Sequence, residues 1–281
     1  MGSTPLVSVC IPVYNTERFI TEALHSVLNQ SFRDLEVVVV DNASTDSTPE
    51  LLAKIADPRV RLFRNEQNIG AAGNFNRAMS LARGRYIKLL CADDLLYPTC
   101  LEKQVEVLEA DTRAEISMVC CSRDIVDSRG KRWLRRGFPG QPGRLGGALA
   151  TAMSIRHGTN IFGEPGAILA RAELARAAGG FDPRYSYCID LDFWCRLLAA
   201  GDLHVIDETL CAFRLSEQSW SLSLGHRQHL EYAEFMEDLH KKRGLHLTWF
   251  DRSAGRLRSR LNAFLRQGLT RFILFNSRSR K

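Results

Sequence analysis

The apolar residues of the chain follow two different patterns. Up to about residue 121, short runs of consecutive apolar residues alternate with segments in which apolar residues recur every three or four positions. The first pattern is typical of strands buried on both faces, and the second of helices that pack one face. Strands that alternate with helices predict an α/β fold with a mostly parallel central sheet flanked by helices. We predict strands at 7–13, 36–41, 60–63, 86–90 and 117–121.

The segments between these strands carry helix signals. Ser47 and Glu50 match an S-x-x-E capping box, which predicts a helix over 51–55. Another helix is predicted from about Ala71, ending before Gly84, which suits a C-cap glycine. Between the first two strands, apolar residues at helical spacing predict a crossover helix: Phe19, Ile20, Ala23, Leu24, Val27 and Leu28.

The second half of the chain is less regular. Residues 128–147 are rich in Gly, Pro and Arg, and we predict a long loop there that orders when a substrate binds. Strand-like stretches follow at 167–170 and 203–215. Helices are predicted at 172–178, 192–200, 226–243 and 253–275.

Charge is distributed unevenly along the chain. The net charge is +6, but residues 252–281 hold nine Lys or Arg and no acid, whereas the remainder has 29 basic and 32 acidic residues. The basicity therefore belongs to the C-terminal tail. The body of the protein offers no surface that combines aromatic and basic residues, so we expect no nucleic-acid partner.

The eight cysteines and the N-terminal sequence indicate the cellular compartment in which the protein works. The cysteines form no C-x-x-C pair, and several lie in apolar runs, so we predict reduced core thiols. No basic segment followed by an apolar one opens the chain, and no run approaches the roughly 18 apolar residues of a spanning helix. We expect a cytoplasmic protein that does not span a membrane.

The basic tail combines apolar and charged residues at helical spacing. From Leu257 to Ile273 the apolar residues recur every three or four positions, and Arg256, Arg258, Arg260, Arg266 and Arg271 supply charge. This pattern is typical of an amphipathic helix at a membrane interface. We therefore expect residues 253–281 to contact the membrane surface, which would place the protein peripherally on its inner face. The alternative is a C-terminal helix docked on the domain with its arginines in solvent.

Polar residues end three of the predicted strands. In an open parallel sheet, ligands bind beyond the carboxyl ends of the strands. Tyr14 follows the first strand, Asp41 ends the second, and the pair Asp93 and Asp94 follows the fourth. No G-x-G-x-x-G or P-loop motif is present, so any phosphate must be held differently. Two adjacent carboxylates would hold a divalent cation, although an Asp-Asp turn that caps a helix would look the same in the sequence.

Five stretches in order resemble family 2 of the glycosyltransferases. Together they cover roughly residues 5–221. They are VSVCIPVYN at 7–15, VVVDNASTD at 38–46, NIG at 68–70 with Asn76, GRYIKLLCADD at 84–94, and GGFD at 179–182 followed by DLDFWCR at 190–196. The resemblance implies the Rossmann-like glycosyltransferase A fold and an inverting sugar transfer.

The resemblance also implies a nucleotide-sugar site. Pro12 and Tyr14 would line the base, Glu17 would approach the ribose or base, and Asp41 would accept a hydrogen bond from the base. Asp93 would contact the ribose. The other residues that we assign to nucleotide-sugar binding are Asn42, Asn68, Gly70 and Lys88.

The same resemblance implies a metal site and a general base. Asp94, with Asp93 beside it, would ligate Mn²⁺ or Mg²⁺ on the diphosphate, and Asp190 would be the general base. A metal supplies the counter-charge for the leaving diphosphate, and a base takes the proton of the attacking hydroxyl. Without the family context, Asp190 and Asp192 would be read as acids at a helix N-terminus.

Some positions depart from the family pattern. Ile189 replaces the acid that often precedes the base, and Cys91 replaces the first acid of the fuller D-x-D-D pattern. Ser216 stands where a histidine is often found, which puts a third protein ligand to the metal in question, and Phe75 replaces an arginine. The Q-x-x-R-W signature of processive synthases is absent, which favours a single transfer per encounter.

These observations define an expected organisation and function. We expect a glycosyltransferase A domain at 1–222, with a nucleotide-binding half at 1–125 and an acceptor-binding half at 126–222, followed by C-terminal helices at 223–281. It would move one sugar from a UDP- or dTDP-type donor to a hydroxyl of a saccharide or lipid-linked saccharide, in cell-surface polysaccharide synthesis. The alternatives are an inactive nucleotide-sugar or glycan-binding module on the same fold and a nucleotidyltransferase. The first would need no base at Asp190, and the second would want a glycine-rich basic loop after the first strand.

Overall fold

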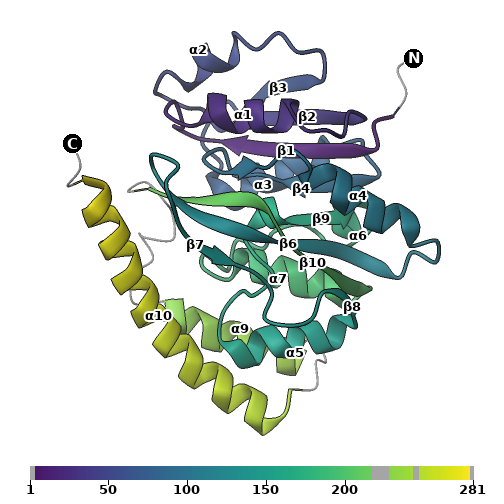
Figure 1. Cartoon of the computed structure of the whole chain (residues 1–281), viewed down its shortest axis with the longest axis vertical. Coiled ribbons are helices and arrows are strands. Elements are labelled where there is room, and N and C mark those ends of the chain that lie inside the picture. The colour runs from purple at the N-terminus through teal and green to yellow at the C-terminus, as the bar shows by residue number, and fades with distance from the viewer. Residues whose placement is uncertain (1–3, 217–227, 243–246, 279–281) are drawn as a thin grey trace.

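The computed structural model describes residues 4–216, 228–242 and 247–278 of the chain. Its centre is a ten-stranded sheet with the order β3-β2-β1-β4-β9-β6-β10-β5, while β7 pairs with β6 and β8 pairs with β10. Figure 1 shows this sheet crossing the middle of the molecule, with helices around it. The α/β architecture predicted from the sequence is confirmed.

The first half of the sheet is parallel. Its strands are β1 (Val7–Val13), β2 (Leu35–Asp41), β3 (Val60–Arg64) and β4 (Tyr86–Leu89). Each agrees with its predicted bounds to within one residue. Every residue of β1, β2 and β4 is buried, because α1 and α4 cover one face of the sheet and α3 covers the other. The helices of this half are α1 (Ile20–Leu28), α2 (Thr48–Leu52), α3 (Gly70–Ser80) and α4 (Cys100–Ala110).

The second half of the sheet mixes strand directions. The long strands β6 (Ile116–Asp127) and β10 (Asp202–Leu215) run parallel, and β9 (Ile168–Arg171) lies antiparallel between β4 and β6. The short strand β5 (Leu95–Leu96) pairs with β10. The helices of this half are α5 (Gly147–His157), the 3-10 turn η1 (Pro165–Ala167), α6 (Ala172–Ala177), α7 (Ile189–Leu198), α9 (Gln228–Lys242) and α10 (Trp249–Arg278).

The prediction of a long loop over 128–147 is wrong. This segment contains β7 (Arg132–Arg136), which pairs with β6, and β8 (Gly143–Leu145), which pairs with β10. Strand β6 also continues six residues beyond its predicted end at 121. Both added strands lie at the margin of the sheet and carry arginines, so they lack the apolar pattern by which strands are recognised.

The capping box predicted at Ser47 and Glu50 does not form. Helix α2 begins at Thr48, three residues earlier than predicted, and the side chain of Ser47 makes no capping hydrogen bond. Instead the backbone N–H of Ser47 donates to a carboxylate oxygen of Glu17 at 2.9 Å. The N–H of Thr48 donates to a carboxylate oxygen of Asp46 at 3.0 Å, so this helix start is satisfied by Glu17 from the loop after β1 and by Asp46.

Gly84 is not a helix cap. Helix α3 ends at Ser80 with Leu81 as its C-cap residue. A Cβ at Gly84 would lie 2.6 Å from the backbone nitrogen of Ser8, so the position needs glycine for close approach of two backbones. The backbone N–H of Gly84 donates to the hydroxyl of Ser8 at 2.8 Å, and that hydroxyl donates to Glu36 at 2.6 Å.

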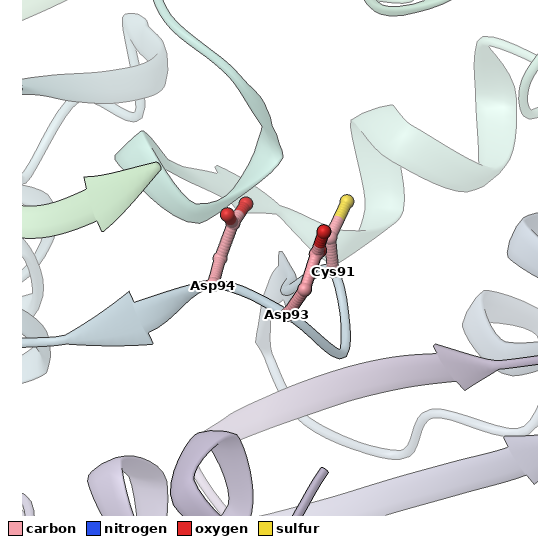
Figure 2. Close-up of side chains that lie close together, drawn as sticks. All are labelled: Cys91, Asp93 and Asp94. Carbon is pink, nitrogen blue, oxygen red and sulfur yellow. The ribbon is translucent and has the colours of Figure 1, made fainter. Parts of the chain in front are cut away.

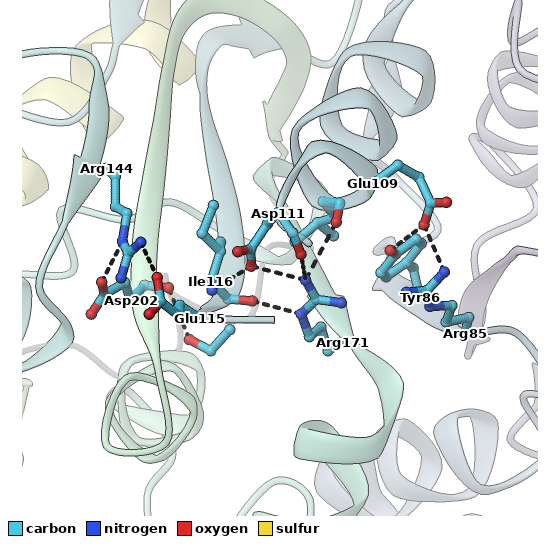
Figure 3. Close-up of polar contacts among 11 residues, drawn as sticks. Arg85, Tyr86, Glu109, Asp111, Glu115, Ile116, Arg144, Arg171 and Asp202 are labelled. Atoms are coloured by element: carbon cyan, nitrogen blue, oxygen red, sulfur yellow. Dashed lines mark hydrogen bonds and ion pairs between the residues drawn. The ribbon is translucent and has the colours of Figure 1, made fainter. Parts of the chain in front are cut away.

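Charged side chains tie the elements together at the edge where β4, β6 and β10 begin (Figure 3). Arg171, at the end of β9, donates to the carbonyl oxygen of Ile116 at 2.8 Å and to the carboxylate of Asp111 at 2.9 Å. Arg144 of β8 bridges Glu115 and Asp202, which lie at the starts of β6 and β10. These contacts fix one edge of the sheet and leave the opposite edge for ligands.

All eight cysteines are free thiols, and every one except Cys91 is buried. Their role as apolar core residues is confirmed. Cys121 and Cys211 lie with their sulfurs 3.9 Å apart on the adjacent strands β6 and β10.

Helix α10 packs on α5 and α9 through one face. This face contains the buried Ser259, Thr270 and Ile273. The side-chain amide of Asn262 donates to the carbonyl oxygen of His157 at 2.8 Å. Docking of the C-terminal helix on the domain is therefore confirmed, although Arg266 on this helix donates to Gln228 rather than lying in solvent. Figure 1 shows α10 running along the outside of the molecule.

The opposite face of α10 is apolar and exposed. Leu257 is 72% exposed and Phe264 is 76% exposed. At 100° per residue, the exposed large apolar side chains of α10 other than Trp249 fall within about a third of the helix circumference. We call them the apolar stripe of α10: Phe250, Leu257, Leu261, Phe264, Leu265, Phe272 and Phe275. Among the described residues, no helix has the length and apolar character needed to cross a membrane.

Candidate active site

A cavity of about 390 Å³ opens at the carboxyl ends of β1, β4, β6 and β10. Pro12 and Tyr14 line it from β1, and Cys91 to Asp93 line it from the loop after β4. Glu164, the start of α7 and α10 form another part of the wall, and residues of α3, β6, β7 and β10 also line it. The cavity therefore lies where an open α/β sheet is expected to bind its ligands.

An acidic cluster follows β4. The side chains of Cys91, Asp93 and Asp94 bring their ligand atoms within 4.8 Å of one another (Figure 2). Burial raises the pKa of Asp93, and burial together with the neighbouring Asp93 raises the pKa of Asp94 well above its usual range. Two buried carboxylates at this separation repel each other, and a divalent cation would relieve that repulsion. Their oxygens suit Mn²⁺ or Mg²⁺, so the residues present fit such a metal.

Arg214 of β10 positions this cluster. Its backbone N–H donates to a carboxylate oxygen of Asp94 at 2.9 Å, and its Nε donates to the carbonyl oxygen of Asp93 at 2.7 Å. Its Nη2 reaches Glu22 of α1 at 2.7 Å, and the guanidinium lies 4.8 Å from the centre of the Phe19 ring. A buried arginine thus joins three elements and holds the loop after β4 in one conformation.

Asp190 lies in the first turn of α7 and lines the cavity. Burial, and to a smaller extent the negative charge of Glu164, raise the pKa of Asp190 to about 7. Glu164 itself is paired with Arg123 of β6, which contributes to holding the pKa of Glu164 below its usual value although burial opposes this. No hydrogen bond from the described residues engages the carboxylate of Asp190. A carboxylate with a pKa near neutrality is suited to accept a proton.

Asp192 has a different environment. Its side chain is fully buried and accepts hydrogen bonds from Arg196, with Nη2 at 2.7 Å and Nε at 3.0 Å. Arg196 also donates to the carbonyl oxygens of Ala178 and Gly180, so this pair supports the turn before α7. Because the two acids lie about 200° apart around α7, only Asp190 faces the cavity.

The turn before α7 is attached to α3 as well. Asn76 donates its side-chain amide to the carbonyl oxygen of Phe181 at 2.9 Å and accepts from the N–H of the same residue at 2.7 Å. A Cβ at Gly180, which has a φ of 77°, would come within 2.4 Å of the Asn76 side chain. The NIG…N and GGFD motifs are therefore parts of one contact that joins the two halves of the sheet.

Four of the predicted site residues line the cavity: Pro12, Tyr14, Asp93 and Asp190. Asp94 lies beside them in the acidic cluster. Asp41 does not line the cavity. Its carboxylate accepts from the N–H of Ser44 at 3.0 Å and lies 3.1 Å from the guanidinium of Arg64.

Asn42, Asn68 and Gly70 also lie outside the cavity lining and belong to a hydrogen-bonded network. The amide of Asn42 donates to the side-chain oxygen of Asn68 at 2.8 Å, and that oxygen also accepts from the N–H of Gly70 at 2.8 Å. Asn65 donates to the oxygen of Asn42 at 2.7 Å. These side chains hold the loops after β2 and β3 against each other.

Glu17 and Lys88 have structural partners too. Glu17 accepts from Ser47 at the start of α2, as described above. Lys88 is fully buried in β4, and its ammonium donates to the carbonyl oxygens of Gly166 and Ile168 at 2.8 and 2.9 Å. Lys88 therefore lies outside the cavity lining, and its contact with the donor stays a prediction.

The sequence did not identify several residues that line the cavity. Glu164, Arg136, Tyr187 and Arg266 were not assigned to it. One signal was available for Glu164: Arg123 lies inside a buried strand, and a charge in that position needs a partner.

Solved structures share this fold. Staphylococcus aureus TarS 1–349 in complex with UDP-GlcNAc superposes with a TM-score of 0.66 at 21% identity, covering 82% of this chain and 64% of that one. The mannosyltransferase PcManGT from Pyrobaculum calidifontis, in complex with GDP-Man and Mn²⁺, gives a TM-score of 0.63 at 20% identity, covering 95% and 74%. At these identities the likeness shows the fold, which is the glycosyltransferase A fold.

Fold and sequence together place the protein among the glycosyltransferases. Residues 8–194 match the family described as Glycosyl transferase family 2. The chain belongs to this family, as its motifs predicted.

Relatives agree with this assignment. An uncharacterised protein of Mycobacterium tuberculosis (strain CDC 1551) is 35% identical over 202 residues, which are 69% of this chain and 62% of that protein. The putative glycosyltransferase EpsE of Bacillus subtilis is 33% identical over 206 residues, 72% of this chain and 69% of EpsE. The putative teichuronic acid biosynthesis glycosyltransferase TuaG of the same organism is 42% identical over 106 residues, 37% of this chain and 42% of TuaG. The chain thus spans less than two thirds of the length of some of these relatives.

The raised pKa of Asp190 predicts a pH-dependent effect on stability. The folded protein holds a proton on Asp190 up to about pH 7, whereas the unfolded chain releases it near the ordinary pKa of 3.8. Stability therefore falls as the pH rises through this window, and the full cost remains above pH 7. We expect Asp190→Asn to raise the melting temperature at about pH 8 and to raise it less at about pH 5, measured by thermal unfolding.

Asp192→Asn is the matched control for this measurement. It removes a buried partner of Arg196, so it should lower the melting temperature at both pH values. An Asp190→Asn effect that is equal at the two pH values would contradict the raised pKa.

Proposed function

We propose that this protein transfers a single sugar from a nucleotide diphosphate sugar of the UDP or dTDP type to a hydroxyl of a saccharide, with inversion at the anomeric carbon. The observation that carries the proposal is that Asp190 shares a cavity with the acidic cluster. A carboxylate with a pKa of about 7 and a pair of carboxylates for a metal are the groups that this reaction needs.

The reaction balances with one base. The acceptor oxygen forms a bond to the anomeric carbon while the bond from that carbon to the diphosphate oxygen breaks. The acceptor proton passes to Asp190, and the electron pair of the broken bond leaves with the nucleotide diphosphate. Attack from the face opposite the leaving group inverts the configuration.

Asp94 and Asp93 would hold Mn²⁺ or Mg²⁺, and TarS and PcManGT were solved with a nucleotide-sugar donor, the latter with Mn²⁺ as well. When bound, the metal supplies positive charge to the diphosphate. Pro12 and Tyr14 would contact the nucleotide, since they line the cavity beside the acidic cluster. The thiol of Cys91 stays protonated because burial and the nearby acids raise its pKa well above its usual range. We therefore assign the metal to the two carboxylates.

The chain divides in function as follows. Residues 1–125 would bind the nucleotide, 126–222 would bind the acceptor, and 223–281 would form the C-terminal helices. EpsE and TuaG are described as putative glycosyltransferases, TuaG in teichuronic acid biosynthesis, and this supports a saccharide acceptor in the synthesis of a cell-surface polysaccharide. The alternative is an inactive binding module, for which an ionisable Asp190 in the cavity would have no use.

The apolar stripe of α10 supports a second part of the proposal, which is contact with a membrane surface. An exposed face of large apolar side chains is costly in water and is typical of an interaction surface. Arg258 lies on one side of the stripe, and Arg260 and Arg271 lie on the other. Apolar side chains between arginines match a bilayer with anionic headgroups, so the protein would lie peripherally on the inner face of the membrane.

The role of Asp190 predicts the effect of an amide at this position. Asp190→Asn keeps the size of the side chain but cannot take a proton, so we expect turnover to fall about a hundredfold or more while UDP affinity stays nearly normal. In the unmodified enzyme, turnover should rise with pH up to about 7 and then level, because only the ionised carboxylate acts as base. Asp192→Asn, compared per folded molecule, should lose much less. Equal losses in the two variants would show that the base lies elsewhere.

The metal assignment predicts a change in nucleotide binding. Asp94→Asn keeps an oxygen for the N–H of Arg214 but removes a negative ligand. We expect the affinity for UDP in Mn²⁺ to fall about tenfold or more, with the weak affinity in EDTA unchanged, as measured by isothermal titration calorimetry. Unchanged affinity in Mn²⁺ would refute the assignment.

The membrane proposal is tested without removing α10, because that helix also covers the domain. The double variant Leu257→Glu with Phe264→Glu should bind anionic phosphatidylglycerol vesicles at least about tenfold more weakly in co-sedimentation, since two apolar contacts become charges. Leu149→Glu is the control, because Leu149 is also exposed but lies on α5. Equal binding by all three proteins would show that the stripe serves another contact.

A further inference from the structure

Two arginines outside the assigned machinery line the same cavity. Arg136 ends β7, and Arg266 lies on α10, so segments 130 residues apart in the sequence meet here. Within the described part of the chain, no hydrogen bond or ion pair engages the guanidinium of Arg136. The Arg136 residue is partly exposed. Partial burial of its guanidinium lowers its pKa, and the charges of Arg123 and Arg266 lower it further, although Glu164 opposes this.

Arg266 is held by neutral groups. Its Nη1 donates to the side-chain oxygen of Gln228 at 3.1 Å, and its guanidinium lies 4.8 Å from the centre of the Tyr187 ring. Its Nη2 lies 3.4 Å from the hydroxyl of Thr159. These contacts fix the side chain without neutralising its charge. Arg123 differs because it is paired with Glu164.

Two positive charges that face one space favour an anion between them. Guanidinium groups bind phosphate and carboxylate through pairs of parallel hydrogen bonds. The donor diphosphate is assigned to the acidic cluster and its metal, in the nucleotide-binding half. Neither arginine belongs to that half, so their ligand belongs to the acceptor.

The wall beside the arginines is apolar. Ile125 of β6, Phe213 and Leu215 of β10, and Leu269 of α10 line this part of the cavity. Leu269 and Arg266 lie on the helix whose other face forms the apolar stripe. A ligand that joins an anion to a hydrocarbon chain would therefore fit here: the anion would contact the two arginines, and the chain would contact the apolar wall beside α10.

We propose that Arg136 and Arg266 form a subsite for the phosphate that joins an acceptor sugar to a prenyl-type lipid, with the start of the lipid chain on the apolar wall. The proposal rests on the proposed function and narrows its acceptor to a lipid-linked sugar phosphate. A free sugar phosphate offers the same anion without the chain, and an acidic sugar offers a carboxylate.

Binding measurements distinguish these ligands. Farnesyl phosphate, glucose 1-phosphate, glucuronate and farnesol would each be titrated into the full chain, with and without UDP and Mn²⁺. We expect farnesyl phosphate to bind most tightly and glucose 1-phosphate more weakly. The double variant Arg136→Gln with Arg266→Gln should weaken both by about tenfold or more, while farnesol binding changes little.

Controls separate a lost subsite from a damaged fold. Arg132→Gln on β7 and Arg256→Gln on α10 remove the same charge from the same elements but outside the cavity lining, and should leave phosphate binding unchanged. Single Lys substitutions at Arg136 and Arg266 should restore part of the affinity.

Several outcomes would overturn the proposal. One is a loss of UDP affinity in the double variant as large as the loss for the phosphate ligands, which would assign the arginines to the donor. Others are glucuronate binding as tight as phosphate binding, or equal binding of glucose 1-phosphate and farnesyl phosphate. A different result, full turnover in Asp190→Asn, would refute the proposed function. The binding titrations do not depend on that result.

Discussion

Repulsion between buried carboxylates is the constraint on which this site depends. Asp93, Asp94, Glu164 and Asp190 surround one cavity, and burial disfavours the charge of each. The fold gives them unequal partners. Glu164 has the guanidinium of Arg123, Asp94 has only a backbone N–H of Arg214, and Asp190 has no hydrogen bond from the described residues. In the proposed function this inequality separates the roles: Glu164 has a lowered pKa, the pair Asp93 and Asp94 would hold a cation, and Asp190 would take up the acceptor proton.

The sequence predicted the framework of the site well, because that framework follows the periodicity of buried strands. The strands β1 to β4 were located closely, and Tyr14 and Asp93 at their carboxyl ends line one cavity, to which α7 contributes Asp190. Polar residues in the motifs were less predictable, because Lys88 and Asn42 look the same in the sequence whether they bind a ligand or brace a loop. Only their contacts distinguish the two roles.

The residues that the sequence missed depend on long-range pairing. Glu164 meets Arg123 because β9 brings the chain back between β4 and β6, 41 residues away in the sequence. Arg136 enters the cavity on β7, a short marginal strand without an apolar pattern. Arg266 enters because α10 folds back over the domain, with one face inside and the other in solvent. No local pattern specifies such contacts.

The antiparallel position of β9 also sets an order of events while the chain is being made. The unit β3-β2-β1-β4 can pair as soon as its own residues have left the ribosome, and domains generally fold from the N-terminus during synthesis. The edge of β4 then stays unpaired until residue 171 emerges. Until then the ammonium of Lys88 lacks its two acceptors in the folded protein, the carbonyl oxygens of Gly166 and Ile168. A charge at this edge disfavours pairing with a foreign strand. The lysine would thus protect the unfinished sheet from aggregation before it becomes part of the core.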